Sequence, residues 1–453
     1  MLDGRWLAPV RRTILDPLYC LKNGSPLRRY WKELEHSQYL PEEELMERQR
    51  QGLMRLLEHA ARNNRFYRER FAAAGVDAKT ITSVQDLSRI PILTKEEVRA
   101  NAGVMISDGY DRERLMRMKT GGSTGRSLEV FLTEECSELR NAMARRHDRW
   151  SGWEVGEPVA AVWGNVTAPA TAKEWLKQRV LYPYISLDTM AVTEQAVLEF
   201  ARKWRRTKPT LLFGHAHSIF VLAQYLDSLG IALRPRAIIA TSMMLAPHER
   251  KVIESVFGVP VTDRYGCEEV SLIASECERH QGMHLNIEHL VVELVTACGA
   301  PAAPGETGRI VVTDLVNLAM PLIRYDVGDL GVPSQRKCPC GRNLPLMERV
   351  MGRSADFLVT RDKVRIAGIS LIENTLTRVA GVAQMQIIQE TPTDLTLRIV
   401  RGRDFCTGSE RELGDYFRGL FGADARVKFE YCDAIPSDGN GKFRFSICKV
   451  DTP

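Results

Sequence analysis

Hydrophobic and polar positions follow a helical period over the first hundred residues. Between residues 41 and 75 a stripe at about 3.6 residues per turn predicts a helix that Gly75 ends. Its members are Met46, Gln49, Leu53, Leu56, Leu57 and Ala60. Thr94 is followed three residues later by Glu97, a capping box that predicts the start of another helix. We therefore expect residues 1–100 to be mostly helical.

The pattern changes in the middle of the chain, where short apolar runs alternate with longer amphipathic segments. The runs cover residues 159–163, 210–213, 237–240 and 259–262, and the segments include 194–205 and 218–229. This alternation is typical of a helix-covered, mostly parallel sheet. Ligands bind such sheets at the carboxyl ends of strands. The loops Gly214-His215, Thr241-Ser242-Met243 and Arg264-Tyr265-Gly266 are therefore candidates to line a site.

The last part of the chain has a third pattern. Residues 287–313 are rich in strand-forming residues, with a turn at Pro304-Gly305. Strand, helix, strand, strand, helix and strand then follow at residues 357–360, 370–378, 384–389, 395–400, 409–421 and 427–431. We predict an α/β protein with a large N-terminal domain of helix-covered, mostly parallel sheets over residues 1–353. A small C-terminal α+β domain is expected over residues 354–453.

Composition narrows the class of protein. The 453 residues are 44% hydrophobic, which suffices for a large core, and the net charge of +5 is too small to indicate nucleic-acid binding. No run approaches the ~20 apolar residues of a membrane span, and no apolar run follows the charged N-terminus. We expect a cytoplasmic protein, monomer or homodimer. Its ten cysteines are then expected to be reduced, and the clustered ones are metal candidates.

A segment rich in glycine and hydroxyl groups is the strongest chemical signal. Residues 119–127 read Lys-Thr-Gly-Gly-Ser-Thr-Gly-Arg-Ser. Glycines let the backbone approach phosphate oxygens, hydroxyl and N–H groups donate to them, and a cation offsets their charge. A Walker loop needs a second glycine where Arg126 stands. The segment therefore predicts a phosphate-binding loop of another kind.

Four more segments follow this loop in order. They are Tyr265-Gly266-Cys267-Glu268-Glu269, residues 324–331, Gly352-Arg353-Ser354-Ala355-Asp356 and residues 436–444, which place Lys442 on a glycine-rich turn. With all five segments in this order, the chain resembles the adenylate-forming superfamily of acyl-CoA ligases, adenylation domains and luciferases over nearly its whole length. Pro91-Ile92-Leu93-Thr94-Lys95, Ile323-Arg324-Tyr325 and Cys338-Pro339-Cys340-Gly341-Arg342 are similar to the phenylacetate-CoA ligase branch. Its capsular-polysaccharide and deazaflavin-cofactor adenylating members are the most similar.

The resemblance implies an ATP-dependent, AMP-forming acid ligase. Attack of a carboxylate on the α-phosphorus builds negative charge, so positioning and cations dominate catalysis. Glu269, rather than Glu268, would bind Mg2+, and Lys442 would bridge the acyl carboxylate and the α-phosphate, with Arg353 near the ribose. The residues expected around ATP are Thr120, Gly121, Gly122, Ser123, Thr124, Gly125, Thr241, Ser242, Met243, Tyr265, Gly266 and Asp329, of which Asp329 would bind the ribose hydroxyls. The resemblance also implies that the small C-terminal domain is mobile, with a hinge near Ser354 and Asp356.

The substrates are less determined. The acid is expected among Trp163, Gly164, His215, His217 and Cys267, which favour an aryl or other small polar acid. Coenzyme A is the first candidate acceptor, but the turn at residues 365–368 does not clearly match the coenzyme-facing turn. An amine (an amide-forming synthetase) or a carrier protein therefore stays open. The alternative of another class is a catalytically degenerate binding or scaffold protein, and the set Lys442, Glu269 and Asp329 argues against it.

A second metal is expected in addition to Mg2+. Cys338 and Cys340 form a short knuckle, and Cys277, His280 and His284 lie upstream. Zinc is commonly held in a tetrahedron of cysteine and histidine ligands, so three cysteines and one histidine would form a closed, structural site. Either histidine completes the set, and the resemblance at Gly282-Met283-His284 favours His284.

Overall fold

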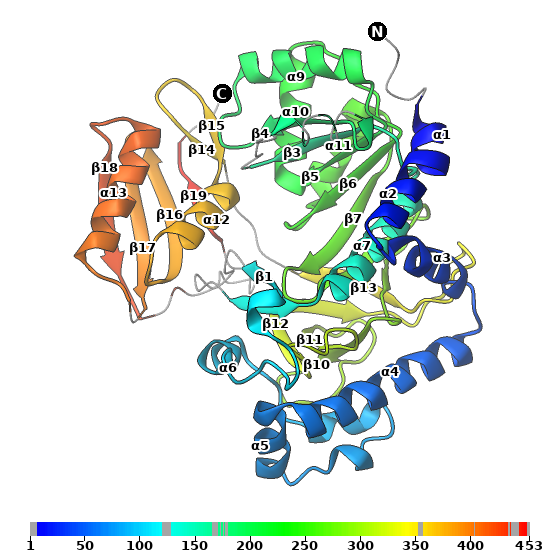
Figure 1. Ribbon diagram of the computed structural model, residues 1–453. Helices are drawn as coiled ribbons and strands as arrows, with labels where there is room; N and C mark the ends of the chain where they lie inside the picture. Colours follow the sequence, from blue (N-terminus) through cyan, green and yellow to red (C-terminus); the bar gives the residue numbers. More distant parts are fainter. Residues whose placement is uncertain are drawn as a thin grey trace.

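The computed structural model describes residues 7–119, 128–164, 180–351, 357–402, 404–433 and 444–450, together with a few single positions between these ranges (Figure 1). An eleven-stranded sheet forms the centre of the large N-terminal part, and a four-stranded sheet forms the C-terminal part. The predicted α/β class is confirmed, with an α+β region at the C-terminal end. No helix among these residues combines the length and the apolar character that crossing a bilayer requires.

The predicted helical start is confirmed. The first helices are α1 (Ala8–Val10), the π-turn η1 (Arg11–Leu15), α2 (Asp16–Lys22), α3 (Leu27–Ser37), α4 (Glu42–Asn63), α5 (Arg65–Ala73), α6 (Lys95–Asn101) and α7 (Glu134–Trp150). The 3-10 turns η2 (Ala78–Thr80), η3 (Gln85–Arg89) and η4 (Arg112–Arg114) connect them. The Thr94 capping box at α6 is present as predicted.

The single helix predicted over residues 41–75 is two helices. Asn64 breaks it, because its backbone is extended and its side chain accepts a hydrogen bond of 3.2 Å from the Tyr67 N–H, capping α5. The stripe on α4 is confirmed except at Met46, which is exposed, while Leu45 is buried in its place. This buried face shares one hydrophobic cluster with β10–β12 residues such as Val291.

The large sheet mixes parallel and antiparallel strands. Its order is β10-β11-β12-β13-β9-β8-β7-β6-β5-β3-β4. The parallel sheet expected from the alternating pattern is confirmed for β3 (Val159–Trp163), β5 (Leu211–His215), β6 (Ala237–Thr241) and β7 (Val261–Cys267). The parallel edge strand β4 (Tyr184–Asp188) was not predicted. The rest is antiparallel: β8 (Ser271–Glu276), β9 (Met283–Leu285), β10 (Leu290–Val295), β11 (Gly308–Asp314), β12 (Tyr325–Pro333) and β13 (Leu346–Met351).

Helices enclose the parallel strands. Side chains of α9 (Glu194–Thr207), α10 (Ala216–Ser228) and α11 (Pro247–Phe257) share one buried cluster with alternate residues of β3, β5 and β6. Helix α7 lies against the other side, where Asp148 reaches Arg264 of β7. The antiparallel pair β1 (Met116–Lys119) and β2 (Glu129–Leu132) precedes α7 and flanks the predicted phosphate loop. The carboxyl ends of the parallel strands therefore lie between these helices and the β1–β2 pair.

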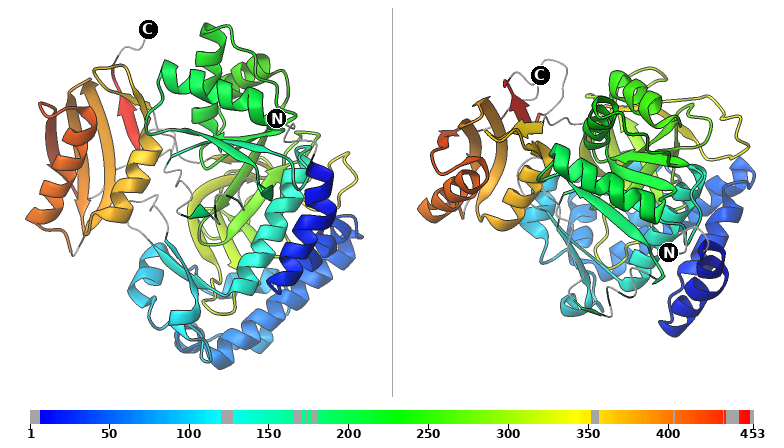
Figure 2. Two further views of the ribbon diagram at one scale, coloured as in Figure 1. Left: turned by 45° about the horizontal axis from the view of Figure 1, so that its top comes forward. Right: turned by 90° about the horizontal axis from the view of Figure 1, so that it is seen from above.

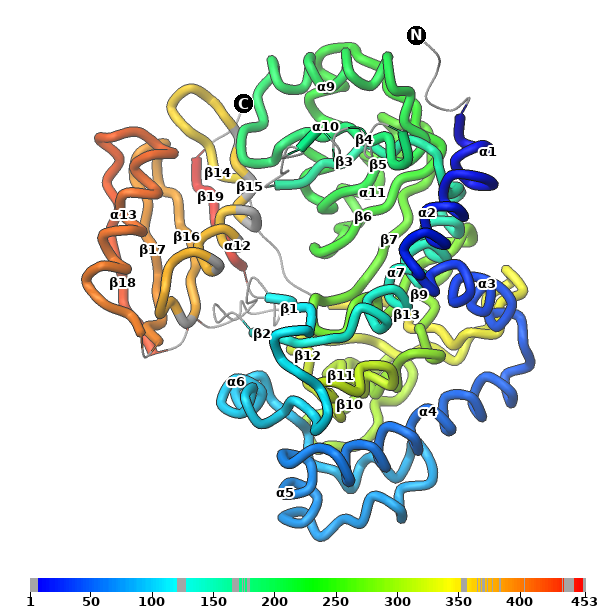
Figure 3. The backbone as a smooth tube through the Cα atoms, in the orientation of Figure 1, coloured from blue at the N-terminus to red at the C-terminus, as the bar shows by residue number. Residues whose placement is uncertain are grey.

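The C-terminal part is compact and distinct in Figure 3. It contains β14 (Phe357–Val359), β15 (Arg365–Ala367), α12 (Gly368–Arg378), β16 (Val382–Thr391), β17 (Asp394–Arg401), α13 (Thr407–Phe421), β18 (Arg426–Tyr431) and β19 (Ser446–Cys448). The predicted order of elements is confirmed, and β15 and β19 are additional short strands. The strand β19 joins the sheet edge parallel to β16, after the chain returns from β18.

Candidate active site

A cavity of about 480 Å³ lies at the carboxyl ends of the parallel strands. The expected site residues that line it are Trp163, Thr241, Ser242, Met243, Tyr265, Gly266, Cys267, Glu269 and Asp329. Ile372 and Phe445 of the C-terminal part line the same cavity. The cavity is therefore built from both parts of the chain, as a site that closes between two lobes requires.

Glu269 is the buried carboxylate of this cavity. Its side chain accepts a hydrogen bond of 2.8 Å from the Tyr325 phenol, and Lys95 Nζ lies 4.0 Å from Oε1. Burial alone would raise the pKa of Glu269, but the Lys95 charge and the Tyr325 hydrogen bond together hold it below its usual value. Glu269 therefore stays ionised at neutral pH, which suits a ligand for a hard divalent cation.

Asp329 is tied to the end of β7. The phenol of Tyr265 donates a hydrogen bond of 3.0 Å to Asp329 Oδ2, across the strands that separate β7 from β12. Asp329 is nearly buried, and Gly328 before it has a positive φ of 81°, which glycine adopts easily. This irregular part of β12 thus presents the Asp329 carboxylate to the cavity beside an aromatic ring.

An aromatic wall closes another side of the cavity. Trp163 and Phe213 stack with ring centroids 5.3 Å apart, and Arg264 lies 5.0 Å over Phe213 while pairing with Asp148 at 2.6 Å. Sequence reasoning named Trp163 and the loop that begins at Arg264, but not Phe213. The period of two along β5 was the available signal, since Phe213 and His215 lie on the face that meets Trp163.

The two expected substrate histidines occupy other positions. His215 is fully buried behind Trp163, with ring centroids 3.9 Å apart, and burial lowers its pKa to about 4. His217 pairs with Glu249 and packs against Phe220 and Phe357. Neither histidine lines the cavity, and Gly164 does not line it either. The neutral His215 ring supports the aromatic wall instead of facing a ligand.

Several expected residues lie outside the described part of the chain. These are Thr120, Gly121, Gly122, Ser123, Thr124, Gly125, Arg353, Ser354, Asp356 and Lys442. Some residues that are near them in the sequence line the cavity. Met118 and Leu132 of the β1–β2 pair do so, and so does Phe445, three residues after Lys442.

The sequence analysis did not predict the buried cations around Glu269. Lys95 is 8% exposed and lines the cavity at the start of α6. Arg140 of α7 donates to the Glu269 carbonyl at 3.0 Å and pairs with Asp314 at 2.7 Å. A lysine in a capping box and an arginine in a helix are ordinary surface residues in a sequence. Only the packing of α6 and α7 against the strand ends buries them.

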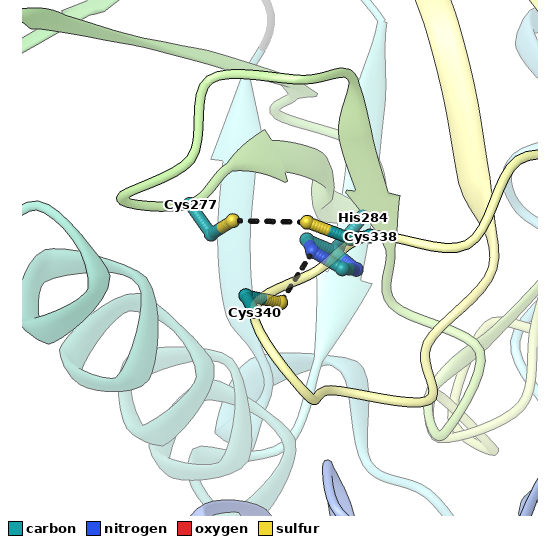
Figure 4. Close-up of side chains that lie close together, drawn as sticks. All are labelled: Cys277, His284, Cys338 and Cys340. Atoms are coloured by element: carbon teal, nitrogen blue, oxygen red, sulfur yellow. Dashed lines mark hydrogen bonds between the residues drawn. The ribbon is translucent and has the colours of Figure 1, made fainter.

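Three cysteines and one histidine form a separate cluster (Figure 4). Cys277 follows β8, His284 lies on β9, and Cys338 and Cys340 precede β13. The ligand atoms all lie within 4.8 Å of one another, with Cys277 Sγ 3.6 Å from Cys338 Sγ and Cys340 Sγ 3.4 Å from His284 Nε2. Two sulfurs on one tetrahedral zinc lie about 3.8 Å apart, so the donor set fits zinc.

The histidine of this cluster is held in a metal-binding form. His284 Nδ1 lies 3.1 Å from the Leu344 carbonyl, which fixes the proton on Nδ1 and directs Nε2 toward the sulfurs. Burial lowers the pKa of His284 to about 4, so the ring is neutral. His280, the other expected histidine, pairs with Glu276 at 3.2 Å and lies outside the cluster.

The C-terminal part and the whole chain are similar to known proteins. Residues 358–449 match the family model of the CapK C-terminal domain. Protein CapK of Staphylococcus aureus is 24% identical over 414 residues, 90% of each chain. Phenylacetate-coenzyme A ligases of Thermus thermophilus and Escherichia coli are 27% and 28% identical, over 73% and 70% of this chain and 75% and 73% of theirs.

Solved structures of 2-hydroxyisobutyryl-CoA ligase share the fold. The open conformation, in complex with 2-HIB-AMP and CoA, covers 90% of this chain and 92% of its own with a TM-score of 0.59 and 19% identity. The thioesterification state covers 91% of each chain with a TM-score of 0.61 and 18% identity. The curated relatives and the C-terminal family model support a place for the chain in the adenylate-forming superfamily, in its phenylacetate-CoA ligase-like branch, and the solved structures share its fold.

Proposed function

We propose that this protein is an AMP-forming ligase that activates a carboxylic acid with ATP and transfers the acyl group to coenzyme A. One observation carries the proposal: a single cavity gathers the ionised Glu269, the Tyr265–Asp329 pair and the Thr241–Met243 loop between two parts of the chain. The names of the phenylacetate-CoA and 2-hydroxyisobutyryl-CoA ligases support the acid–thiol reaction.

The reaction has two steps. An oxygen of the acid attacks the α-phosphorus of ATP, the bond to pyrophosphate breaks, and an acyl-adenylate forms. The thiolate of coenzyme A then attacks the acyl carbon and AMP leaves with the electron pair of the broken C–O bond. Asp329 would hold the ribose hydroxyls as an acceptor, with the Tyr265 phenol fixing its orientation at 3.0 Å. A bound Mg2+ would offset charge on the phosphates, and Glu269 is the residue that would hold it.

Lys442 is proposed as the cation that bridges the acid and the α-phosphate. Its neighbour Phe445 lines the cavity, and three residues of extended chain span about 10 Å. The position of Phe445 therefore supports this role for Lys442. Ser354 and Asp356 are proposed to form the hinge region between the two parts, and Arg353 to act near the ribose. Ser123, Thr124 and Gly125 are proposed to hold the leaving phosphates.

The acyl group is proposed to be a small aryl or polar acid. The stacked Trp163 and Phe213 offer a flat apolar wall, against which an aromatic acid packs by offset stacking. Cys267 and Met243 line the same cavity. An amine or a carrier protein in place of coenzyme A would leave the first step unchanged.

The four-residue cluster is proposed as a structural zinc site. Cys277, His284, Cys338 and Cys340 would fill all four positions of the tetrahedron and leave none for a substrate. The cluster links β8, β9 and the segment before β13, so the metal would hold the antiparallel strands next to β7 in register.

The experiment is product identification by mass. The protein is incubated with ATP, Mg2+, a panel of aryl and alkyl acids, and either coenzyme A or a panel of amines. The proposal predicts AMP together with an acyl-CoA for at least one acid. If an amide forms and no thioester does, the acyl acceptor is an amine and not coenzyme A. If no acid leads to the formation of AMP under any condition, the proposal is contradicted.

A further inference from the structure

The N-terminal helical segment turns two charged side chains inward beside the small apolar Ala8 and Cys20, and turns its larger apolar side chains outward. The residues that it turns inward include Arg11 and Asp16, each only 3% exposed. Ile14, Leu18 and Leu21 face outward and are 50%, 56% and 80% exposed. A helix on the surface of a globular protein normally buries its apolar side chains and exposes its polar ones. The reversed arrangement therefore needs an explanation outside the core of this chain.

Polar contacts fix the orientation of this segment. Arg11 donates to the carbonyls of Val180 and Gly156 at 2.6 and 3.2 Å, and Arg145 of α7 donates two hydrogen bonds to Asp16 at 2.6 and 2.9 Å. Arg11 is hydrogen-bonded to carbonyls and Asp16 is paired with Arg145, so turning the helix to hide Leu18 and Leu21 would break these buried contacts. The fold thus holds the apolar side chains toward solvent.

The apolar surface extends beyond the helix. Val180 and Tyr182 are 38% and 39% exposed, and the Tyr182 ring meets Tyr19 of α2 edge-on at 6.4 Å. Twelve large apolar side chains are exposed in the described part of the chain. Val10, Ile14, Leu18 and Leu21 belong to the helical segment, and Val180 and Tyr182 to a segment that contacts it at Arg11 and Tyr19. We call these six residues the N-terminal apolar surface. Contiguous apolar patches on soluble proteins mark contact sites.

Positive charge accompanies this surface. Residues 7–32 contain six lysines and arginines and one aspartate, and of these cations Arg12 pairs with Glu154 and Arg29 lies 3.9 Å from Glu33. Lys22 follows Leu21 directly and is exposed, as are Arg29 and Lys32 of α3. A second copy of the chain would bring these like charges together across a symmetric contact, which opposes self-association. An anionic partner with an apolar interior fits both properties.

We propose that the N-terminal apolar surface docks on an anionic lipid bilayer. Helices that lie in the bilayer interface bury leucine and aromatic side chains at the headgroup boundary, while lysine and arginine pair with lipid phosphates. Figure 2 shows that the N-terminal helices and the C-terminal part lie on opposite sides of the molecule, so docking leaves the C-terminal part clear of the bilayer. The proposal is independent of the ligase reaction.

The test is flotation of the full-length protein with lipid vesicles. Vesicles of phosphatidylcholine alone are compared with vesicles that also contain phosphatidylglycerol, at low and high salt. We expect binding to the anionic vesicles only, weakened by salt. Leu18→Asp/Leu21→Asp is expected to lower the partition coefficient by at least about tenfold, because two apolar side chains leave the interface. Met46→Asp, at an exposed apolar position on α4, is the matched control and is expected to bind as the wild type does.

Lys22→Glu/Arg29→Glu is a second variant that tests charge without touching the apolar residues. It is expected to lose the preference for phosphatidylglycerol while its thermal unfolding midpoint stays unchanged. Absence of binding to anionic vesicles, or equal binding by Leu18→Asp/Leu21→Asp, would overturn the proposal. A dimer that the same double variant abolishes, without vesicle binding, would assign the surface to self-association and overturn it as well.

Discussion

The phenol of Tyr265 donates a 3.0 Å hydrogen bond to Oδ2 of Asp329, joining the end of β7 to β12 across the cavity. Both side chains line the cavity, so this bond sets the carboxylate where a ribose is proposed to bind. This hydrogen bond therefore joins two segments that resemble separate motifs of the superfamily and brings them to the same cavity.

Tyr265→Phe tests the orientation of Asp329. The variant removes one hydrogen bond to a carboxylate, and the expected effect is a rise of about tenfold in KM for ATP with kcat nearly unchanged. Asp329→Ala removes the proposed ribose acceptor itself and is expected to raise KM further. Steady-state kinetics with ATP varied would measure both. Wild-type KM in Asp329→Ala would contradict the ribose role.

Glu269→Gln tests the proposed Mg2+ ligand. The amide keeps the shape of the side chain and its acceptor oxygen but loses the charge, so we expect a loss of at least about a hundredfold in the adenylation rate. Glu268→Gln is the matched control, because Glu268 lines the same cavity but is exposed. Rates are measured over a range of Mg2+ concentrations. If the two variants lose adenylation rate equally, Glu269 is not the specific Mg2+ ligand.

Lys95→Met tests how the pKa of Glu269 is held down. Without this cation at 4.0 Å, burial is expected to raise the pKa of Glu269 above its ordinary 4.5. The acid limb of the pH–rate profile should then move to higher pH. In the wild type the lowered pKa stabilises the fold above pH 4.5, and this stabilisation is lost as pH falls through the folded-state pKa. Lys79→Met, at an exposed lysine on η2, is expected to leave the profile unchanged.

Metal analysis tests the Cys/His cluster. We expect about one zinc per chain, as a closed four-ligand site holds. Cys340→Ser should lower the zinc content and the thermal unfolding midpoint, and a chelator should lower the midpoint of the wild type. Cys298→Ser, at an exposed cysteine outside the cluster, should change neither. A purified wild type without zinc whose midpoint does not respond to added zinc would exclude the site.

Much of the fold could be predicted from the sequence, because the hydrophobic period shows which face of a helix or strand is buried. The strand runs at residues 159–163 and 237–240 and the capping box at Thr94 all lie where the pattern predicted them. The break at Asn64 was not readable, because the apolar period continues on both sides of it. The exposure of Met46 reflects a shift of the stripe toward Leu45, which the spacing alone fits equally well.

The candidate active site and the metal cluster could be predicted from the sequence only in part. Motif order named Tyr265, Glu269 and Asp329, and the cavity contains all three. Local spacing could not separate His280 from His284, because their positions depend on pairing between distant strands: His284 lies opposite Leu346 of β13, six residues beyond Cys340. The burial of Lys95 likewise depends on tertiary packing and has no local signature.

The most direct test of the adenylation claim is acid-dependent exchange of labelled pyrophosphate into ATP, with no acyl acceptor present. We predict exchange with at least one acid of the aryl and alkyl panel, and a loss of at least about a hundredfold in Lys442→Ala, whose cation is proposed to meet the α-phosphate. Exchange that does not require an acid, or exchange that Lys442→Ala leaves intact, would contradict the account.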